Sequence, residues 1–168
     1  IQYHLAEAGI DHEEVDPITT DLGFSPFQVA VIEGELLGDG CLYRRDDGDC
    51  FFQLSTTTRA HAARLMEKLP DGLFPASQPV SYIREGGLGD DAYTCWRITS
   101  RPQSRFQRMY DDWYEVRTEQ NRKVVPADYT LERTALLHWY WGDGNCCLRD
   151  SGAPRVSFAT HGFPERCV

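Results

Sequence analysis

The chain has 168 residues, a length that suits one compact domain or two small half-domains that share a core. Its net charge of −9 argues against a polycation that coats nucleic acid without specificity, although it leaves room for a local basic strip. No apolar run approaches the roughly 20 residues of a membrane span and no signal peptide is visible, so we expect a cytoplasmic protein with no membrane partner.

The basic residues are almost all arginine. Of the 17 Lys and Arg residues only Lys68 and Lys123 are lysines, and aspartate is more frequent than glutamate. This balance fits a halophilic host with a high-salt interior, and it fits equally an ordinary acidic protein from a GC-rich genome. The six cysteines form no Cys-x-x-Cys pair, so we expect small buried hydrophobic side chains rather than a zinc site or a disulfide framework.

The first elements along the chain follow from helix caps and turn residues. Residues 1–23 are polar and acid-rich, and they resemble either the end of a helix-turn-helix or an arbitrary helical tail. A capping box with Ser25 at the N-cap, Pro26 at N1 and Gln28 at N3 starts a helix that runs to Gly40. Apolar periodicity and turn residues then predict strands at 41–45 and 50–55, a helix at 58–69, strands at 80–85 and 92–100, and a helix at 105–116.

A second series of elements follows a connector at residues 121–128. Thr130 is the expected N-cap of the next helix, which ends at Gly144. A strand pair is then expected at 146–149 and 155–160. The order helix, hairpin, helix, hairpin, helix is thus followed by one helix and one hairpin, so the second unit is expected to be incomplete.

Two stretches of the chain are alike, and each is an apolar helical run that ends in Gly-Asp-Gly. One covers residues 32–40 and the other residues 136–144. A carboxylate at a helix C-terminus meets the negative end of the helix dipole, which costs roughly 0.3–1 kcal/mol. Two such ends brought together add repulsion on the order of 4 kcal/mol at 4 Å and an effective dielectric constant near 20. This arrangement suggests a bound cation, and Mg²⁺ is the natural candidate because it prefers oxygen ligands.

The paired motif, with a hairpin after each copy, resembles the LAGLIDADG homing endonucleases, specifically the single-chain type with two motif copies. The resemblance covers roughly residues 24–168 and implies an α+β fold of two pseudo-symmetric α-β-β-α-β-β-α units. The motif helices would pack at the pseudo-twofold axis, and the antiparallel sheets would form a DNA-binding saddle. The first unit would span residues 24–129 and the incomplete second unit residues 130–168. The bulky His138 and Trp141 depart from the family pattern, so the second helix is expected to pack less closely at its start.

In this family the acids that end the two motif helices bind the metal ions, which makes Asp39 and Asp143 the expected catalytic and metal-binding residues. Gly38 and Gly142 match the small position before each acid and belong to the same expected metal site. Mg²⁺ or another divalent cation held by paired carboxylates can supply a nucleophilic water, charge stabilisation and help for the leaving oxygen in phosphodiester hydrolysis. The family also often uses a basic residue from the segment before the next motif helix. Lys123 occupies that segment, and we expect it to be a catalytic residue that stabilises charge or positions water. The alternative is a solvated loop lysine.

Three further polar residues have weaker assignments. Thr56, at the end of the second predicted strand, and His161 are candidates for holding water, although His161 could equally be a surface residue. His138 lies on an apolar helix, and we expect a hydrogen-bonded core histidine there rather than a metal ligand.

Strand alternation predicts which side chains face the DNA groove. In the strand at 50–55, Phe52 and Leu54 point inward, which leaves Gln53 and Ser55 outward. Arginine with guanine and glutamine with adenine are the geometric pairings that read base edges. Each outward residue could instead be a solvated strand residue, and a shift of strand register would move all of them together. The expected DNA contacts are Tyr43, Arg45, Gln53, Ser55, Tyr82, Arg84, Tyr93 and Arg97 in the first unit and Arg149, Arg155 and Ser157 in the second.

The leading hypothesis is therefore a site-specific, Mg²⁺-dependent endonuclease that cuts both strands of a DNA target. It would be encoded by an intron, an intein or a free-standing gene, and it would act as a monomer if full length. The rival hypothesis is a non-cleaving nucleic-acid-binding protein on the same scaffold, either a transcription regulator or an RNA maturase. A folded but inert element is the third.

Overall fold

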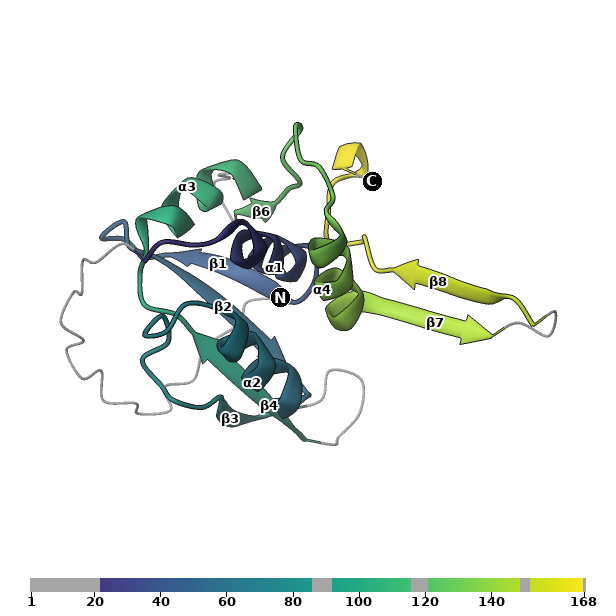
Figure 1. Ribbon diagram of the computed structural model, residues 1–168, viewed down its shortest axis with the longest axis horizontal. Coiled ribbons are helices and arrows are strands. Elements are labelled where there is room, and N and C mark those ends of the chain that lie inside the picture. Colours follow the sequence, from purple (N-terminus) through teal and green to yellow (C-terminus); the bar gives the residue numbers. More distant parts are fainter. Residues whose placement is uncertain (1–21, 86–91, 116–120, 149–151, 168) are drawn as a thin grey trace.

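The computed structural model describes residues 22–85, 92–115, 121–148 and 152–167, and its elements form the α+β fold that the sequence predicts (Figure 1). The helices are α1 (Pro26–Leu37), α2 (Arg59–Lys68), α3 (Ser104–Trp113) and α4 (Arg133–Asp143), with a short 3₁₀ helix η1 (Glu165–Cys167). The strands are β1 (Gly40–Arg44), β2 (Cys50–Thr56), β3 (Val80–Arg84), β4 (Tyr93–Thr99), β5 (Tyr114–Glu115), β6 (Arg122–Lys123), β7 (Gly144–Leu148) and β8 (Pro154–Phe158). Within the described ranges no helix has the length and apolar character needed to cross a membrane. Of the predicted N-terminal tail (residues 1–23), residues 1–21 lie outside the described ranges.

The first motif helix begins where the sequence places it. In α1 the Ser25 hydroxyl accepts a hydrogen bond from the Gln28 amide N–H at 3.3 Å, and the Gln28 side-chain oxygen accepts one from the Ser25 amide N–H at 3.0 Å. The predicted capping box is therefore confirmed. The helix ends at Leu37, and the chain passes through Gly38 and Asp39 directly into β1, so the acid lies at the junction of a helix and a strand.

Strands β1 to β4 form an antiparallel sheet in the order β1-β2-β4-β3. Strand register pairs Leu42 with Phe52 and Leu54 with Ile98, so these four apolar side chains share one face. They are almost completely buried, because α1, α2 and α3 pack against that face (Figure 1). Since these helices lie on one side, Gln53, Ser55 and Arg97 are left on the other side, where a partner can reach them.

Three helix boundaries differ from the sequence prediction by more than one residue: α1 ends at Leu37 rather than at Gly40, and the end of α3 and the start of α4 differ for backbone reasons. Helix α3 ends at Trp113 instead of three residues later, because Tyr114 is extended (φ −131°, ψ 132°) and starts β5. The Tyr114 hydroxyl accepts a hydrogen bond from the Leu42 amide N–H at 2.9 Å. Strand β5 pairs with β6, which lies inside the segment predicted to be a connector. Helix α4 starts after Glu132 rather than after Thr130, because Glu132 itself is extended (φ −85°, ψ 158°).

The cysteines are all free, but not all of them are buried. Cys50 and Cys95 are buried as expected, whereas the expectation is wrong for Cys146 and Cys147, which are exposed on β7. Within the described residues, strands β7 and β8 pair only with each other, and they extend from α4 away from the four-stranded sheet (Figure 1). Most of this hairpin has no layer packed on it in the described part of the chain, so even Leu148 is 80% exposed.

Helices α1 and α4 pack side by side, as the two motif helices are expected to do (Figure 1). A Cβ built on Gly34 would lie 2.4 Å from the Ala135 carbonyl oxygen and 2.6 Å from the His138 Cβ, so no side chain fits at this position. The expected looser packing near His138 is not found, because the missing side chain of Gly34 makes room for the imidazole. Further along, a Cβ built on Gly38 would lie 3.7 Å from the Gly142 Cα, so the backbones stay close up to the two acids.

We predict that Gly34→Ala lowers the free energy of unfolding by about 1–3 kcal/mol, because overpacking at a tight contact forces backbone shifts. Gly23→Ala is the matched control, since a Cβ built on Gly23 meets nothing within 4 Å. Urea unfolding followed by circular dichroism measures both variants. Equal unfolding free energies for the two would contradict the close packing of α1 on α4.

Candidate active site

The C-terminal ends of α1 and α4 meet and bring Asp39 and Asp143 together. A Cβ built on Gly142 would lie 3.4 Å from the Asp39 amide nitrogen and 3.8 Å from the Asp39 Oδ2. A Cβ built on Gly38 would lie 3.8 Å from the Asp143 amide nitrogen. The glycine before each acid is thus next to the other acid, which is the convergence that the sequence pattern predicts.

The two acids share an electronegative position, in which Asp143 is half-buried and Asp39 is exposed, although part of its carboxylate is shielded from water. Burial raises the pKa of Asp39, and the nearby carboxylates of Asp143 and Glu35 raise it further. Burial also raises the pKa of Asp143, although the charges of Lys123 and His161 oppose this rise. Carboxylates crowded in this way are stabilised by a cation, and oxygen atoms are the ligands that Mg²⁺ prefers. The residues present therefore fit a divalent cation between the two helix ends.

Lys123 on β6 is fixed at the C-terminal end of α1. Its Nζ donates hydrogen bonds to the carbonyl oxygens of Leu36 at 2.8 Å, Gly38 at 3.0 Å and Gly40 at 2.8 Å. These bonds use all three N–H donors of the ammonium group, so none is left for water or phosphate in this conformation. The positive charge lies at the negative end of the helix dipole, where it offsets the unfavourable placement of Asp39. Burial nevertheless lowers the pKa of Lys123.

A cavity of about 420 Å³ opens beside Asp39. Gly142, Thr56 and His61 line it, and two arginines and two tyrosines complete much of its wall: Arg64, Arg84, Tyr82 and Tyr93. One carboxylate, several hydrogen-bonding groups and two guanidinium groups therefore surround a single space. Guanidinium groups bind phosphate oxygens through charge-assisted hydrogen bonds, so this cavity has the chemistry to hold a phosphodiester next to an acid.

Comparison with known proteins identifies a family for the chain. The family model of the LAGLIDADG DNA endonucleases matches residues 29–168. The chain belongs to this family. Its fold is similar to that of the homing endonuclease I-WcaI bound to its DNA recognition sequence, with a TM-score of 0.72 and 16% sequence identity, over 87% of this chain and 64% of that one. The chain thus spans less than two thirds of that structure's length, and a search of the curated proteins returned no match.

The residues between Tyr43 and Arg97 that the sequence predicts to contact DNA lie on one face of the sheet. Strand register pairs Ser55 with Arg97 and Gln53 with Thr99, which confirms the predicted alternation. The Arg97 Nε donates to the Ser55 Oγ at 3.4 Å, and the Arg97 guanidinium lies 4.4 Å from the centre of the Tyr82 ring. These contacts orient the arginine side chain over the sheet. The same face carries the other candidates of this group: Tyr43, Arg45, Arg84 and Tyr93.

Of the candidates predicted in the second half of the chain, not all fall within the described residues. Arg155 and Ser157 share one face of the hairpin β7–β8, whereas Arg149 lies outside the described residues. Of the two weaker candidates, Thr56 lines the cavity beside Asp39 and His161 is an exposed residue whose charge lowers the pKa of Asp143.

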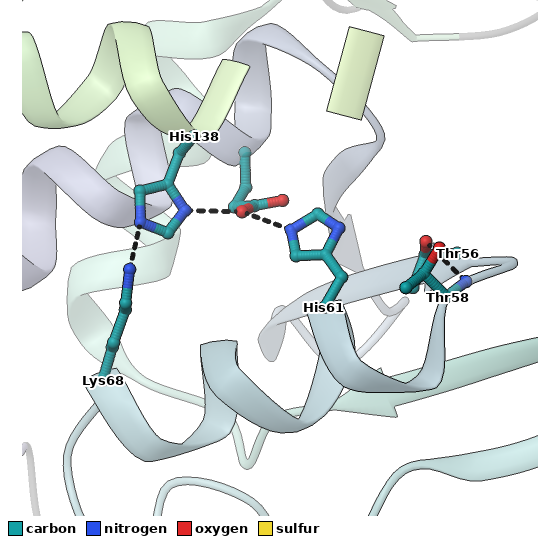
Figure 2. Close-up of polar contacts among 6 residues, drawn as sticks. Thr56, Thr58, His61, Lys68 and His138 are labelled. Atoms are coloured by element: carbon teal, nitrogen blue, oxygen red, sulfur yellow. Dashed lines mark hydrogen bonds and ion pairs between the residues drawn. The ribbon is translucent and has the colours of Figure 1, made fainter. Parts of the chain in front are cut away.

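A row of buried polar groups, not anticipated from the sequence, joins α1, α2 and α4 (Figure 2). Glu35 of α1 is fully buried, and its Oε1 lies 2.7 Å from the His138 Nδ1 and 3.0 Å from the His61 Nε2. The Lys68 Nζ lies 3.1 Å from the His138 Nε2 and 4.6 Å from the centre of the Trp141 ring. His138 is therefore a hydrogen-bonded core histidine, as expected.

Glu35 is ionised inside the helix interface. Burial by itself would raise the pKa of Glu35, but hydrogen bonds from His138 and His61 outweigh it and hold the pKa below its ordinary value. The ligand atoms of these three residues also lie within 4.8 Å of one another, a spacing at which a metal ion could be held. Two signals in the sequence pointed here: an acid on the buried side of an apolar helix, and a histidine where the first motif copy has Gly34.

We predict that Lys123→Met lowers the free energy of unfolding by about 2–3 kcal/mol, because it removes charge-assisted hydrogen bonds to carbonyl groups that remain partly buried. Arg122→Met removes the same charge from the neighbouring position of β6, and we expect it to change stability by less than about 0.5 kcal/mol. Urea unfolding measures both. Equal losses would mean that the bonds from Lys123 to α1 contribute nothing of their own.

We predict that Asp39→Asn stabilises the protein at neutral pH when divalent cations are removed. The folded state holds the Asp39 proton more tightly than the unfolded chain, so ionisation opposes folding. This penalty is absent below the ordinary aspartate pKa of about 3.9 and grows as the pH rises through the higher folded-state pKa. Because Asp39 is partly solvated, we expect a gain below about 1 kcal/mol.

Thermal unfolding in a chelator, at acidic and at neutral pH, checks this expectation. The stabilisation should appear at neutral pH and vanish below pH of about 3.9, where the unfolded chain is also protonated. Added Mg²⁺ should then raise the melting temperature of the parent more than that of the variant, since only the parent keeps both carboxylates. A gain that persists in acid would show that repulsion between ionised groups is not its cause.

Proposed function

We propose that this protein is a site-specific endonuclease that makes double-strand breaks in DNA by metal-dependent hydrolysis of phosphodiester bonds. The observation that carries the proposal is the convergence of Asp39 and Asp143 at the ends of two packed helices. A divalent cation such as Mg²⁺, held by these two residues, would stabilise negative charge and activate water. Each acid would serve one strand of the duplex, with residues 24–129 and 130–168 as the two units.

The surrounding residues of the chain prepare this centre. Gly38 and Gly142 leave room for the oxygen atoms of two acids to approach each other. Lys123 acts as a fixed positive charge near both acids, because its three donors are engaged by the carbonyl oxygens of Leu36, Gly38 and Gly40 and cannot follow the substrate. It would stabilise the charge of the transition state through space rather than by donating a hydrogen bond.

Double-stranded DNA is the proposed partner, and it would lie along the polar face of the sheet. The related I-WcaI structure is of a homing endonuclease bound to its DNA recognition sequence, which supports this choice. A protein of net charge −9 needs its arginines gathered on the contact surface, and Arg45, Arg84 and Arg97 share that face. Arg97 is oriented by Ser55 and Tyr82, as a residue that reads a base edge must be.

We predict that the chain cuts members of a randomised-target DNA library in the presence of Mg²⁺. Asp39→Asn and Asp143→Asn should each lower cutting by at least about 100-fold, because each variant loses a ligand of the catalytic ion. DNA binding should be kept in both variants. Sequencing of the cut ends measures cleavage, and a gel-shift assay on the selected targets measures binding. Equal cutting by the parent and both variants would end the proposal. Binding by the parent without any cutting would favour a transcription regulator or an RNA maturase on the same scaffold.

A further inference from the structure

The direction of the hydrogen bonds in the buried row follows from Lys68. An ammonium group can only donate, so the His138 Nε2, 3.1 Å away, must accept. The position of the Lys68 Nζ, 4.6 Å from the centre of the Trp141 ring, suits the charged form. A neutral imidazole has one donor and one acceptor, so the His138 Nδ1 carries the hydrogen and donates it to the Glu35 Oε1 at 2.7 Å.

The same logic fixes the second histidine. An ionised carboxylate can only accept, so the His61 Nε2 carries the hydrogen that lies in the 3.0 Å contact with the Glu35 Oε1. In the neutral ring the other nitrogen, Nδ1, is then an acceptor. Among the described residues Nδ1 forms no hydrogen bond. It is also absent from the set of buried side-chain atoms without a partner, so it is not sealed inside the protein. Figure 2 shows this nitrogen on the side of the ring away from the carboxylate, toward Thr56.

His61 is therefore presented to the cavity in a defined state. Its side chain is 10% exposed, and it lines the same cavity as Asp39 and Thr56. Its ring is held by the Glu35 carboxylate and by the edge of Trp141, with ring centroids 6.1 Å apart. A histidine fixed in this way places one hydrogen-bond acceptor next to the acid of the first motif helix.

We propose that the His61 Nδ1 accepts a hydrogen bond from the water that attacks the phosphodiester beside Asp39, and that Glu35, oriented by His138 and Lys68, holds His61 in the tautomer this requires. The inference rests on the proposed nuclease function and names a further catalytic residue for it. His61 contacts the reacting water, whereas Glu35 and His138 are positioning residues. Misplacement of a reacting group by about 1 Å costs on the order of 100-fold in rate, so loss of this acceptor has a measurable effect.

A metal ion bound to the row itself is the competing explanation. The ligand atoms of Glu35, His61 and His138 lie within 4.8 Å, and the Glu35 Oε2 is buried without a partner among the described residues. A metal ion would need the lone pair of the His138 Nδ1, which would put the ring hydrogen on Nε2. That hydrogen would point at the ammonium group of Lys68 only 3.1 Å away, donor against donor. Lys68 therefore favours the hydrogen-bonded row over a metal site.

The tautomers can be observed without any metal or DNA. Long-range ¹⁵N–¹H correlation spectra of ¹⁵N-histidine-labelled protein in a chelator distinguish a protonated from an unprotonated ring nitrogen, and the His61→Gln and His138→Gln spectra assign the signals. We expect the hydrogen on Nε2 of His61 and on Nδ1 of His138. A His61 with its hydrogen on Nδ1 would overturn the proposal. A His138 with its hydrogen on Nε2 would also overturn it, and would favour the metal site.

Strand-resolved cleavage tests the catalytic role. His61→Gln keeps an amide donor near the Nε2 position but has no acceptor at the Nδ1 position, so the bond to Glu35 can persist while the contact to water is lost. We expect cutting of one strand to fall about 100-fold, with the other strand, the melting temperature and DNA binding little changed. His61→Asn is the matched variant, since its side-chain oxygen lies near the Nδ1 position, and it should retain more cutting of that strand than His61→Gln.

The outcomes separate this inference from the function on which it rests. Suppose that the parent chain cuts both strands. If His61→Gln then cuts both strands as well as the parent, or loses the same activity on both, the role of His61 is overturned and the nuclease function still stands. His61→Asn that cuts no better than His61→Gln also overturns it. A parent chain that cuts no DNA overturns the proposed function, and the inference falls with it.

Discussion

The close approach of α1 and α4 is the constraint on which the rest of the structure depends. It exists because Gly34 has no side chain where the Ala135 carbonyl oxygen and the His138 Cβ come nearest. The same approach continues to Gly38 and Gly142, and it determines where the two acids lie relative to each other. With α4 held farther away, α1 could still pack against the sheet, but the terminal carboxylates of the two helices could not share a cation. Packing and proposed chemistry are thus two consequences of one short distance.

This approach brings unfavourable charges together, and the chain offsets them with its only two lysines. Lys123 binds the carbonyl groups at the end of α1, and Lys68 binds the His138 ring that contacts Glu35. In a chain with far more arginine than lysine, both exceptions lie at the helix interface. The physical reason at Lys123 is geometric, because three carbonyl oxygens converge on one nitrogen. A compact ammonium group can donate to all three, whereas a planar guanidinium group cannot.

The two motif helices are alike in sequence pattern but not in chemistry. Helix α1 contributes a buried acid, Glu35, and α4 contributes a buried histidine, His138, and the two meet at 2.7 Å. The imidazole donates to the Glu35 Oε1, whereas two copies of α1 packed together would bury two carboxylates that face each other. The pseudo-symmetry is therefore broken at the interface itself. As a result, within the part of the chain that the structure describes, only Asp39 shares a cavity with a histidine, His61, that is held by this buried row.

Local features of the sequence were sufficient for much of the fold. The capping box at Ser25, the alternation in β2 and the repeated Gly-Asp-Gly endings depend on neighbouring residues, and each is found in the structure as predicted. The boundaries of α3 and α4 were less accurate, because extended residues such as Tyr114 are stabilised by distant partners. The exposure of Cys146 was missed for a related reason, since burial depends on which layer packs against a strand.

The amino-acid sequence by itself determined the family, the order of elements and the pair of acids, because these follow from short-range patterns and from a motif that occurs twice. Only the tertiary structure decided which groups those acids meet. Lys123 has all of its donors engaged, and Glu35 is joined to His61 and His138, because residues from separate helices and strands converge there. Such contacts depend on the packing of whole elements, and no local pattern of residues specifies a distance across the interface of two helices.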